Sequence, residues 1–381
     1  MRVFLAMLLD SYRELNSRKL FWITLILSGI VVGLFAFVGI TDRGLKVFIW
    51  EIPIKVFNAN FVTPATFYKL IFVNLGVSVW LAWAATILAL ISTAGMIPDF
   101  VAGGAIELTL SKPISRARLL LTKYVSCLLF TALQVTVFST AAFLLIGLRG
   151  GEWIPGVFLA IPLIVTFYSY LFCVCALVGL ITRSTIAALL VTLLVWFGMF
   201  AVNFVDRVMV RLRSNSELRL EEIEKTIGRM ETNTRNALDA QKAPDAATET
   251  YTAQQLDAAN PFLPRKRSQL VEERKALKKW AQWTDAFYIG KTVLPKTTET
   301  IDVLKRRLIA QADLEKLMPP DEDANIQKED NDDVRVADRE IMKRTEQNFR
   351  ERPLWWIVGT SLGFEAVVLG IATVIFCRRD F

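Results

Sequence analysis

Few residues of this 381-residue chain have the types and spacing that catalysis requires. Residues 359–363, GTSLG, match the Gly-x-Ser-x-Gly pattern that exposes a nucleophilic serine on a sharp strand-to-helix turn. The segment lies inside a long apolar run, and the chain contains no histidine to pair with the serine. We therefore predict that the chain has no catalytic residue of its own.

Two other fragments resemble nucleotide or metal sites without completing them. Residues 290–292, GKT, match the end of a phosphate-binding loop, but Asp285 stands where that loop requires its first glycine. Cys173 and Cys175 are two residues apart, which points them to different faces of a helix. We predict neither a nucleotide site nor a metal site in this chain.

A single acidic residue, Glu365, lies near the middle of the last apolar run. A charged side chain at the centre of a bilayer costs roughly 2.5–3.5 kcal/mol on insertion scales, so such residues are retained mostly for function. Glu365 is therefore a candidate intramembrane polar site. The alternative is that it faces the other helices and pairs with a hydroxyl or an amide group.

The composition places these residues in a membrane protein. The chain is 53% hydrophobic, and its net charge is +7. Between 206 and 352 there are 28 Lys and Arg against 28 Asp and Glu, so the excess positive charge lies in the apolar remainder. Basic residues that flank apolar runs set membrane topology, and the pattern excludes nucleic acid as a partner.

Six apolar runs are each long enough to cross a bilayer as a helix. They lie at roughly 20–40, 70–95, 120–147, 155–181, 186–205 and 354–376. Residues 1–19 have the spacing of an amphipathic helix on the membrane surface, and 45–61 have the composition of an interfacial segment. The predicted fold is an all-α polytopic membrane protein with six transmembrane helices. Two glycine pairs, Gly29 with Gly33 and Gly359 with Gly363, predict faces for close helix packing.

The basic residues in the short loops predict that both termini are cytoplasmic. In this orientation the cytoplasmic flanks hold eleven Lys and Arg and the outer short loops hold five. Residues 206–353 then lie outside, between the fifth and sixth spans. Their recurring apolar residues predict a helical, partly coiled-coil domain, and the acidic stretch at 319–333 predicts a flexible connector.

The most informative segment is the cytoplasmic loop at 96–119, between the second and third spans. Gly103 and Gly104 end the helix that leaves the membrane, and Pro113 ends the short helix after them. Between these breaks, Glu107 presents a carboxylate to the cytoplasm. We predict a short, rigid cytoplasmic element suited to contact a partner.

This loop closely resembles that of type-2 ATP-binding-cassette (ABC) exporter permeases. The order is an acidic residue, a glycine, an apolar-Glu-Leu run, Ser-x-Pro, and then Arg and Lys before the third span. The matching residues are Asp99, Gly104, Glu107, Leu110, Ser111, Pro113, Arg116 and Lys123. The surface helix, the six spans and the large outer loop also fit this family.

The resemblance implies three regions with separate tasks. Residues 1–205 form the surface helix and spans 1–5 with the coupling loop, 206–353 form the extracytoplasmic loop domain, and 354–381 form span 6 and the C-terminus. A separate ATPase subunit binds ATP and Mg²⁺ and docks beneath the coupling loop, where Glu107, Lys112 and Arg116 are the expected contacts. This chain itself needs no cofactor.

The implied assembly is a homo- or heterodimer of permeases among the lipids of the bacterial inner membrane. Its expected task is to export a lipid-like, amphipathic or small-molecule substrate. The long outer loop leaves a second function open, in which the complex transports nothing and acts mechanically on an envelope protein. An ion-coupled transporter is disfavoured because internal repeats and paired intramembrane charges are missing from the sequence.

Overall fold

The computed structural model describes residues 13, 19–41, 44–48, 50–52, 63–102, 115–240, 251–309 and 336–379. The chain divides into two compact units. The membrane unit comprises residues 1–203, 291–317 and 353–381, and the loop unit comprises 204–290 and 318–352. The surface helix predicted at 1–19 lies almost entirely outside the described residues.

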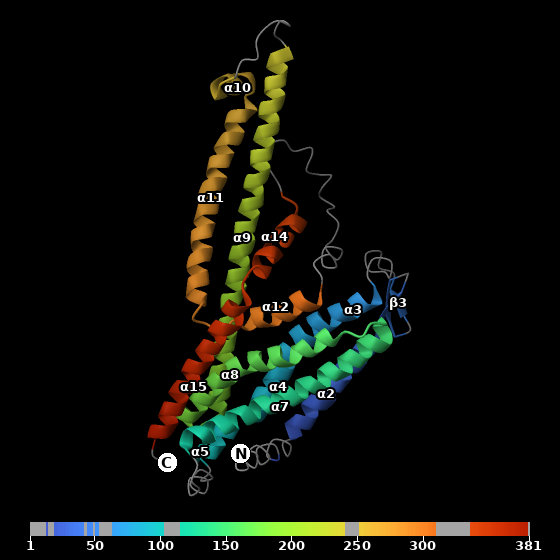
Figure 1. Cartoon of the computed structure of the whole chain (residues 1–381), viewed down its shortest axis with the longest axis vertical. Helices are drawn as coiled ribbons and strands as arrows, with labels where there is room; N and C mark the ends of the chain where they lie inside the picture. The colour runs from blue at the N-terminus through green and yellow to red at the C-terminus, as the bar shows by residue number, and fades with distance from the viewer. Residues whose placement is uncertain are drawn as a thin grey trace. The chain divides into compact units, whose positions relative to one another are not determined.

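Within the described residues, six helical spans are long and apolar enough to cross a membrane, which confirms the predicted fold class (Figure 1). They are Lys19–Phe37, Pro64–Val101, Arg116–Gly150, Pro155–Thr182, Thr185–Ala240 and Trp355–Arg378. The first is α2 (Lys19–Phe37), and the second contains α3 (Pro64–Ile71), η1 (Phe72–Ala85), α4 (Thr86–Thr93) and most of α5 (Met96–Ala102). The third joins α7 (Arg116–Leu145) to η2 (Ile146–Gly150), and the fourth joins η3 (Pro155–Leu159) to α8 (Ala160–Thr182). The last two are α9 (Thr185–Ala240) and η5 (Trp355–Gly359) with α15 (Thr360–Arg378).

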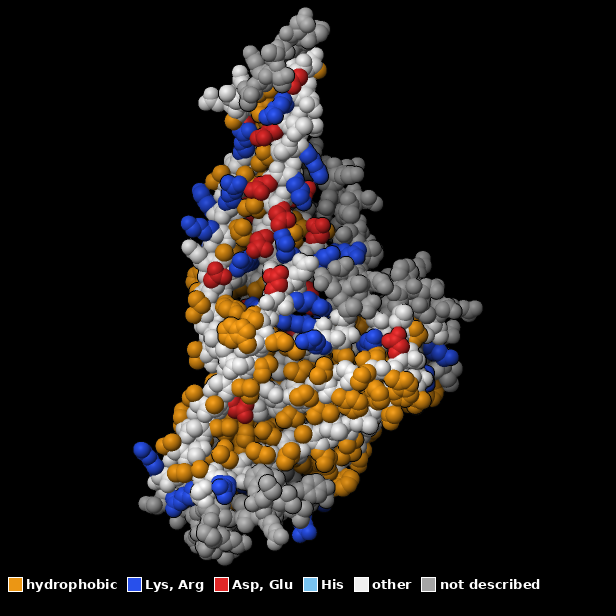
Figure 2. Space-filling view, viewed as in Figure 1, with side chains coloured by type: hydrophobic (Ala, Val, Ile, Leu, Met, Phe, Trp, Pro, Cys, Tyr) orange, Lys and Arg blue, Asp and Glu red, His pale blue; other side chains and the backbone are white. Residues whose placement is uncertain are grey.

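Helix α8 forms the centre of the membrane unit. Its aromatic side chains Phe167, Tyr168, Tyr170 and Phe172 are almost completely buried. Helices α7 and α15 pack along it, and Tyr124 of α7 stacks on Phe172. The outer faces of the helices expose apolar side chains, which form the hydrophobic surface visible over α2 and α7 in Figure 2. This surface suits contact with lipid chains.

A small antiparallel sheet follows α2 and was not predicted. Strand β1 (Val38–Thr41) pairs with β2 (Gly44–Val47), which pairs with β3 (Trp50–Ile52). The interfacial segment predicted at 45–61 is therefore in part a β-ribbon, and its residues 53–61 lie outside the described part of the chain. Gly44 has a φ of 142°, which a residue with a side chain rarely adopts, and it permits the turn between β1 and β2.

The loop unit is built from paired helices. The C-terminal part of α9 packs on α10 (Ala253–Ala259) and α11 (Phe262–Lys291) through a small apolar cluster of Ile223, Ile227, Leu256 and Leu263. Ion pairs between α9 and α11 flank this cluster, and α14 (Asp338–Arg350) is bonded to α9 through Arg344 and Glu221. Figure 2 shows the alternating acidic and basic side chains over these helices. The flexible connector predicted at 319–333 lies outside the described residues.

One helix of the long loop belongs to the membrane unit. Helix α12 (Thr297–Leu308) packs against α8, η1 and η3, and it buries Val303, Leu304 and Leu308. The predicted extracytoplasmic domain comprises the whole of 206–353. Within this range, the described residues 291–309 belong to the compact unit that contains the spans, and the extracytoplasmic position of 206–353 stays a prediction.

Candidate functional site

Two hydroxyl groups from neighbouring helices hold the Glu365 carboxylate of α15. The Tyr124 hydroxyl of α7 donates to Oε1 at 2.8 Å, and the Ser169 hydroxyl of α8 donates to Oε2 at 2.7 Å. The Glu365 side chain is half-buried, and within the described parts of the chain it forms no ion pair with a Lys or an Arg. The intramembrane acid predicted from the sequence is thus stabilised by neutral donors.

A buried tyrosine connects this carboxylate with α12. The Tyr170 hydroxyl of α8 is within electrostatic range of Glu365 and close to the hydroxyl groups of Thr300 and Ser361. The Tyr170 oxygen has no hydrogen-bond partner of ordinary geometry among the residues that the structure describes. Polar groups therefore extend from Glu365 to the first turn of α12.

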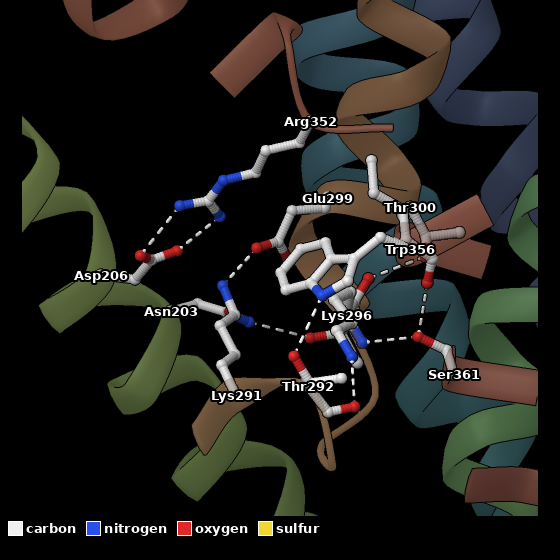
Figure 3. Close-up of polar contacts among 12 residues, drawn as sticks. Asn203, Asp206, Lys291, Thr292, Lys296, Glu299, Thr300, Arg352, Trp356 and Ser361 are labelled. Carbon is white, nitrogen blue, oxygen red and sulfur yellow. Dashed lines mark hydrogen bonds and ion pairs between the residues drawn. The ribbon is translucent and has the colours of Figure 1, made fainter. Parts of the chain in front are cut away.

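Helix α12 begins above a cluster of buried polar side chains (Figure 3). Lys291 and Glu299 form an ion pair whose side chains are only 3% and 4% exposed. Because both partners are buried, loss of either one would break a buried ion pair, which is strongly destabilising. Asn203 of α9 donates to the Thr297 hydroxyl at 3.2 Å, which joins the fifth span to the same cluster.

The completely buried Lys296 is the central cation of this cluster. Its ammonium group donates to the Thr292 carbonyl at 2.7 Å and to the Thr360 hydroxyl at 2.5 Å. It also lies 4.7 Å from the centre of the Trp356 ring, which attracts a cation through its electron-rich face. The Lys296 amide donates to the Ser361 hydroxyl at 2.9 Å. The serine of the GTSLG segment therefore has a structural role.

Burial controls the protonation of Lys296. Loss of hydration disfavours the charged form and lowers the pKa of Lys296 to about 8. The nearby Glu299 carboxylate opposes this shift, and the Lys291 cation adds to it. Lys296 therefore loses its proton at a much lower pH than an exposed lysine does.

The described ends of the predicted coupling loop contact two different helix ends. At one end, the Asp99 carboxylate of α5 accepts a hydrogen bond from the Thr185 hydroxyl at the start of α9, at 3.3 Å. At the other, the Arg116 guanidinium donates to the Arg379 carbonyl at 2.7 Å and to the Cys377 carbonyl at 3.4 Å. The two ends of the loop are thus linked to spans five and six.

The C-terminal end of α8 contacts both the end of α15 and the helix α5 that leads into the loop. Arg379 donates to the Leu180 carbonyl at 2.6 Å, which binds the end of α15 to the end of α8. Gly179 lies against Pro98 of α5, and a Cβ atom at Gly179 would lie only 2.9 Å from the Pro98 Cγ. This close contact places α5 directly on α8, just before the loop begins.

The remaining predicted site residues are five residues of the coupling loop and four glycines of the spans. Gly104, Glu107, Ser111, Lys112 and Pro113 lie outside the described residues. At the glycine pairs Gly29 with Gly33 and Gly359 with Gly363, an added Cβ would have no atom of another described segment within 4 Å. The close helix packing predicted for these glycines therefore stays a prediction.

Sequence reasoning missed the partners of the candidate residues. Tyr124 and Ser169 were not singled out, and neither were the ion pair of Lys291 with Glu299 or the buried Lys296. A weak signal for the last three existed, because charged residues at 291, 296 and 299 flank threonines next to an amphipathic helix. Only the folded chain shows that their side chains are buried.

A bundle of six apolar helices, with its ionic groups concentrated beyond the helix centres, defines a polytopic membrane protein. A family model described as ABC-2 family transporter protein matches residues 72–261, about half of the chain. The chain belongs to this family and is an ABC-2 type permease. Searches of curated proteins and of solved structures found no match.

Membership of the ABC-2 family fixes the general role of the chain. Such a permease is the membrane component of an ABC transporter, and ATP is hydrolysed by an associated ATPase subunit. The family usually works as a dimer. The matched residues include the predicted coupling loop, so the resemblance found in the sequence and the family match concern the same segment.

Proposed function

We propose that this permease exports a lipid-like or amphipathic substrate from the bacterial inner membrane, powered by a separate ATPase subunit beneath the loop at 96–119. The observation that carries the proposal is the family match over residues 72–261, which spans this loop and helices two to five. Two permease copies and two ATPase subunits would form the working complex. Both termini of the permease are cytoplasmic in this arrangement.

The contacts at the loop ends support a route for mechanical coupling. Asp99 binds the start of α9, and Arg116 binds the end of α15. A push on the loop by the ATPase would therefore act on spans five and six as well as on spans two and three. The expected contacts of the ATPase with Glu107, Lys112 and Arg116 are part of this proposal.

The polarity of the membrane unit supports the substrate class. Large apolar side chains cover the outer faces of the spans, and they include Ile186, Leu194 and Phe197 of α9. Few polar groups interrupt this surface, and Asn74 of η1 is one of them. Such a surface suits a substrate with a long apolar part and a small polar group.

ATP hydrolysis by the purified complex tests the substrate class. The complex would be extracted from native membranes, reconstituted in vesicles of a single zwitterionic lipid, and assayed with added amphipathic lipids. Stimulation by one lipid class, and loss of that lipid from the leaflet on the ATPase side, is the expected result. Activity that no lipid or amphiphile changes would contradict a lipid-like substrate.

The loop unit favours the alternative function, in which the complex acts mechanically on an envelope protein. Ion pairs of Arg219 with Glu273 and of Arg274 with Glu224 connect the paired helices α9 and α11. Paired helices of this kind can transmit force to a partner. ATPase stimulation by a purified envelope protein, with no effect of lipids, would establish this function in place of export.

A further inference from the structure

Glu365 occupies a position at which a membrane protein can store a proton. It is ten residues after Trp355 and 13 residues before Arg378, the two ends of its span, so it lies near the middle of that span. A carboxylate at this depth without a counter-ion is costly, whereas a protonated carboxyl group costs much less. A proton can be stored here only if the neighbouring side chains form hydrogen bonds with both the ionised and the protonated carboxyl group of Glu365.

The two hydroxyl groups that bind Glu365 each have a second acceptor. The Tyr124 hydroxyl is 2.8 Å from Glu365 Oε1 and 2.9 Å from the carbonyl oxygen of Ser169. The Ser169 hydroxyl is 2.7 Å from Glu365 Oε2 and 2.8 Å from the carbonyl oxygen of Thr166. A hydroxyl group has one proton, so each can donate in only one of its two directions at a time.

Two proton arrangements follow, and both are fully hydrogen-bonded. With Glu365 ionised, both hydroxyl protons point to its carboxylate. With Glu365 protonated, its own proton is donated to one hydroxyl oxygen, and that hydroxyl turns its proton to a backbone carbonyl of α8. Helical carbonyls already accept a backbone hydrogen bond, so they remain satisfied in either arrangement.

The surroundings of Glu365 contain no charged group, among the described residues, that would fix one form. From α7 the titratable neighbour is Tyr124, and from α8 they are Tyr170 and Cys173. The segment η5 has no titratable side chain, and no Lys or Arg of the described residues pairs with the carboxylate. We propose that Glu365 is a proton-binding site of the membrane unit, at which a proton is taken up and released without rearrangement of the helices.

Labelling with dicyclohexylcarbodiimide tests this proposal. The reagent dissolves in the bilayer and modifies protonated carboxyl groups in apolar surroundings, and mass spectrometry locates the modified residue. The full chain would be reconstituted in phosphatidylcholine vesicles and labelled from mildly acid to mildly alkaline pH. We expect modification of Glu365 at low pH and a progressive loss of modification as the pH rises.

Two conservative variants test the roles of the hydroxyl groups. Tyr124→Phe and Ser169→Ala each remove a donor that stabilises the ionised form. Each should therefore change the pH range over which Glu365 is labelled, because one hydrogen bond to the carboxylate is lost. Thr373→Ala is the matched control, because the Thr373 hydroxyl of α15 donates to the Leu369 carbonyl and does not contact Glu365.

The proposal would be overturned by labelling that is constant over the pH range. It would also be overturned if Glu365 were never labelled in folded protein, or if neither hydroxyl variant shifted the midpoint more than Thr373→Ala. Folding of each variant is checked by size-exclusion chromatography. The assay requires no ATPase and no substrate, so its outcome is independent of the proposed export function.

Discussion

At the scale of the residue, burial changes the protonation of a charged side chain, Lys296. Lys296 is completely buried, yet it has hydrogen-bond partners and an aromatic ring for its charged form. These contacts only partly replace hydration, because burial still lowers the pKa of Lys296 to about 8. Ionisation of this residue must therefore be linked to the stability of the fold.

The pKa of Lys296 predicts how stability depends on pH. Between about pH 8 and about 10.5, the unfolded chain keeps the Lys296 proton and the folded chain has lost it. Stability from this group must therefore rise with pH in that window and be lost as the pH falls back through it. In Lys296→Met the group is absent, so the thermal midpoint of the variant should rise less over the window than that of the wild type.

The measurement is the thermal unfolding midpoint of detergent-solubilised protein at both ends of this pH window. The difference between the wild-type and variant profiles reports the titration of Lys296 together with its effect on the neighbouring Lys291 and Glu299. Parallel profiles for the two proteins would contradict the assigned effect of burial.

The partners of Glu365 show what sequence reasoning can and cannot provide at this scale. The acid was predicted because an acidic residue inside an apolar run is conspicuous. Its donors are 241 and 196 residues away in the chain, and tyrosine and serine are common in membrane helices. No local pattern could have selected Tyr124 and Ser169 before the packing of α7, α8 and α15 was known.

At the scale of the element, the helices that could be predicted are those whose hydrophobic runs are long enough to cross a membrane. All six spans were predicted, because a hydrophobic run of sufficient length has few other solutions, and the fifth helix continues past the predicted end of its span at 205 as far as Ala240. The β-ribbon at 38–52 was missed, since its first strand continues the apolar run of α2 without a break in composition. The placement of α12 was also missed, because its charged residues resemble those of the surrounding polar loop.

The contact between α5 and α8 predicts the effect of a side chain at Gly179. Gly179→Leu would place atoms within 2.9 Å of Pro98 and force α5 away from α8. Overpacking of this kind costs about 1–3 kcal/mol, and here it would move the helix that leads into the coupling loop. We expect the ATP hydrolysis rate of the purified complex to fall while the complex remains assembled.

Gly228→Leu is the control for this experiment, since a Cβ added at Gly228 would have no atom of another described segment within 4 Å. ATP hydrolysis would be measured per mole of complex for both variants. Equal rates in Gly179→Leu and the wild type would show that the position of α5 is not part of the coupling route.

At the scale of the whole molecule, the loop unit is closed by a pair of residues near its two ends. Arg352 and Asp206 form two hydrogen bonds of 2.7 and 3.0 Å, and the two side chains are 10% and 3% exposed. The Arg352 guanidinium also lies over the Phe349 ring at 4.5 Å. This buried pair joins the end of the long loop to its beginning.

Loss of one partner should destabilise the loop unit. Arg352→Met removes both hydrogen bonds to the buried Asp206 carboxylate, and breaking a buried ion pair costs about 3–5 kcal/mol. Limited proteolysis of the variant in vesicles should cut the loop unit much faster than in the wild type. The double variant Arg352→Met with Asp206→Leu should be more resistant than the single one, whereas equal resistance of all three proteins would refute the role of the pair.

The central claim is that this permease is driven by a separate ATPase docked at the loop of residues 96–119. The most direct measurement is purification of the tagged chain from its native membranes in mild detergent, scored for a co-purifying ATPase subunit and vanadate-sensitive ATP hydrolysis. We expect that an ATPase subunit is recovered with the wild type and is lost from Glu107→Arg, with the permease still folded. Recovery of the permease without any ATPase, or undiminished recovery with Glu107→Arg, would contradict the account.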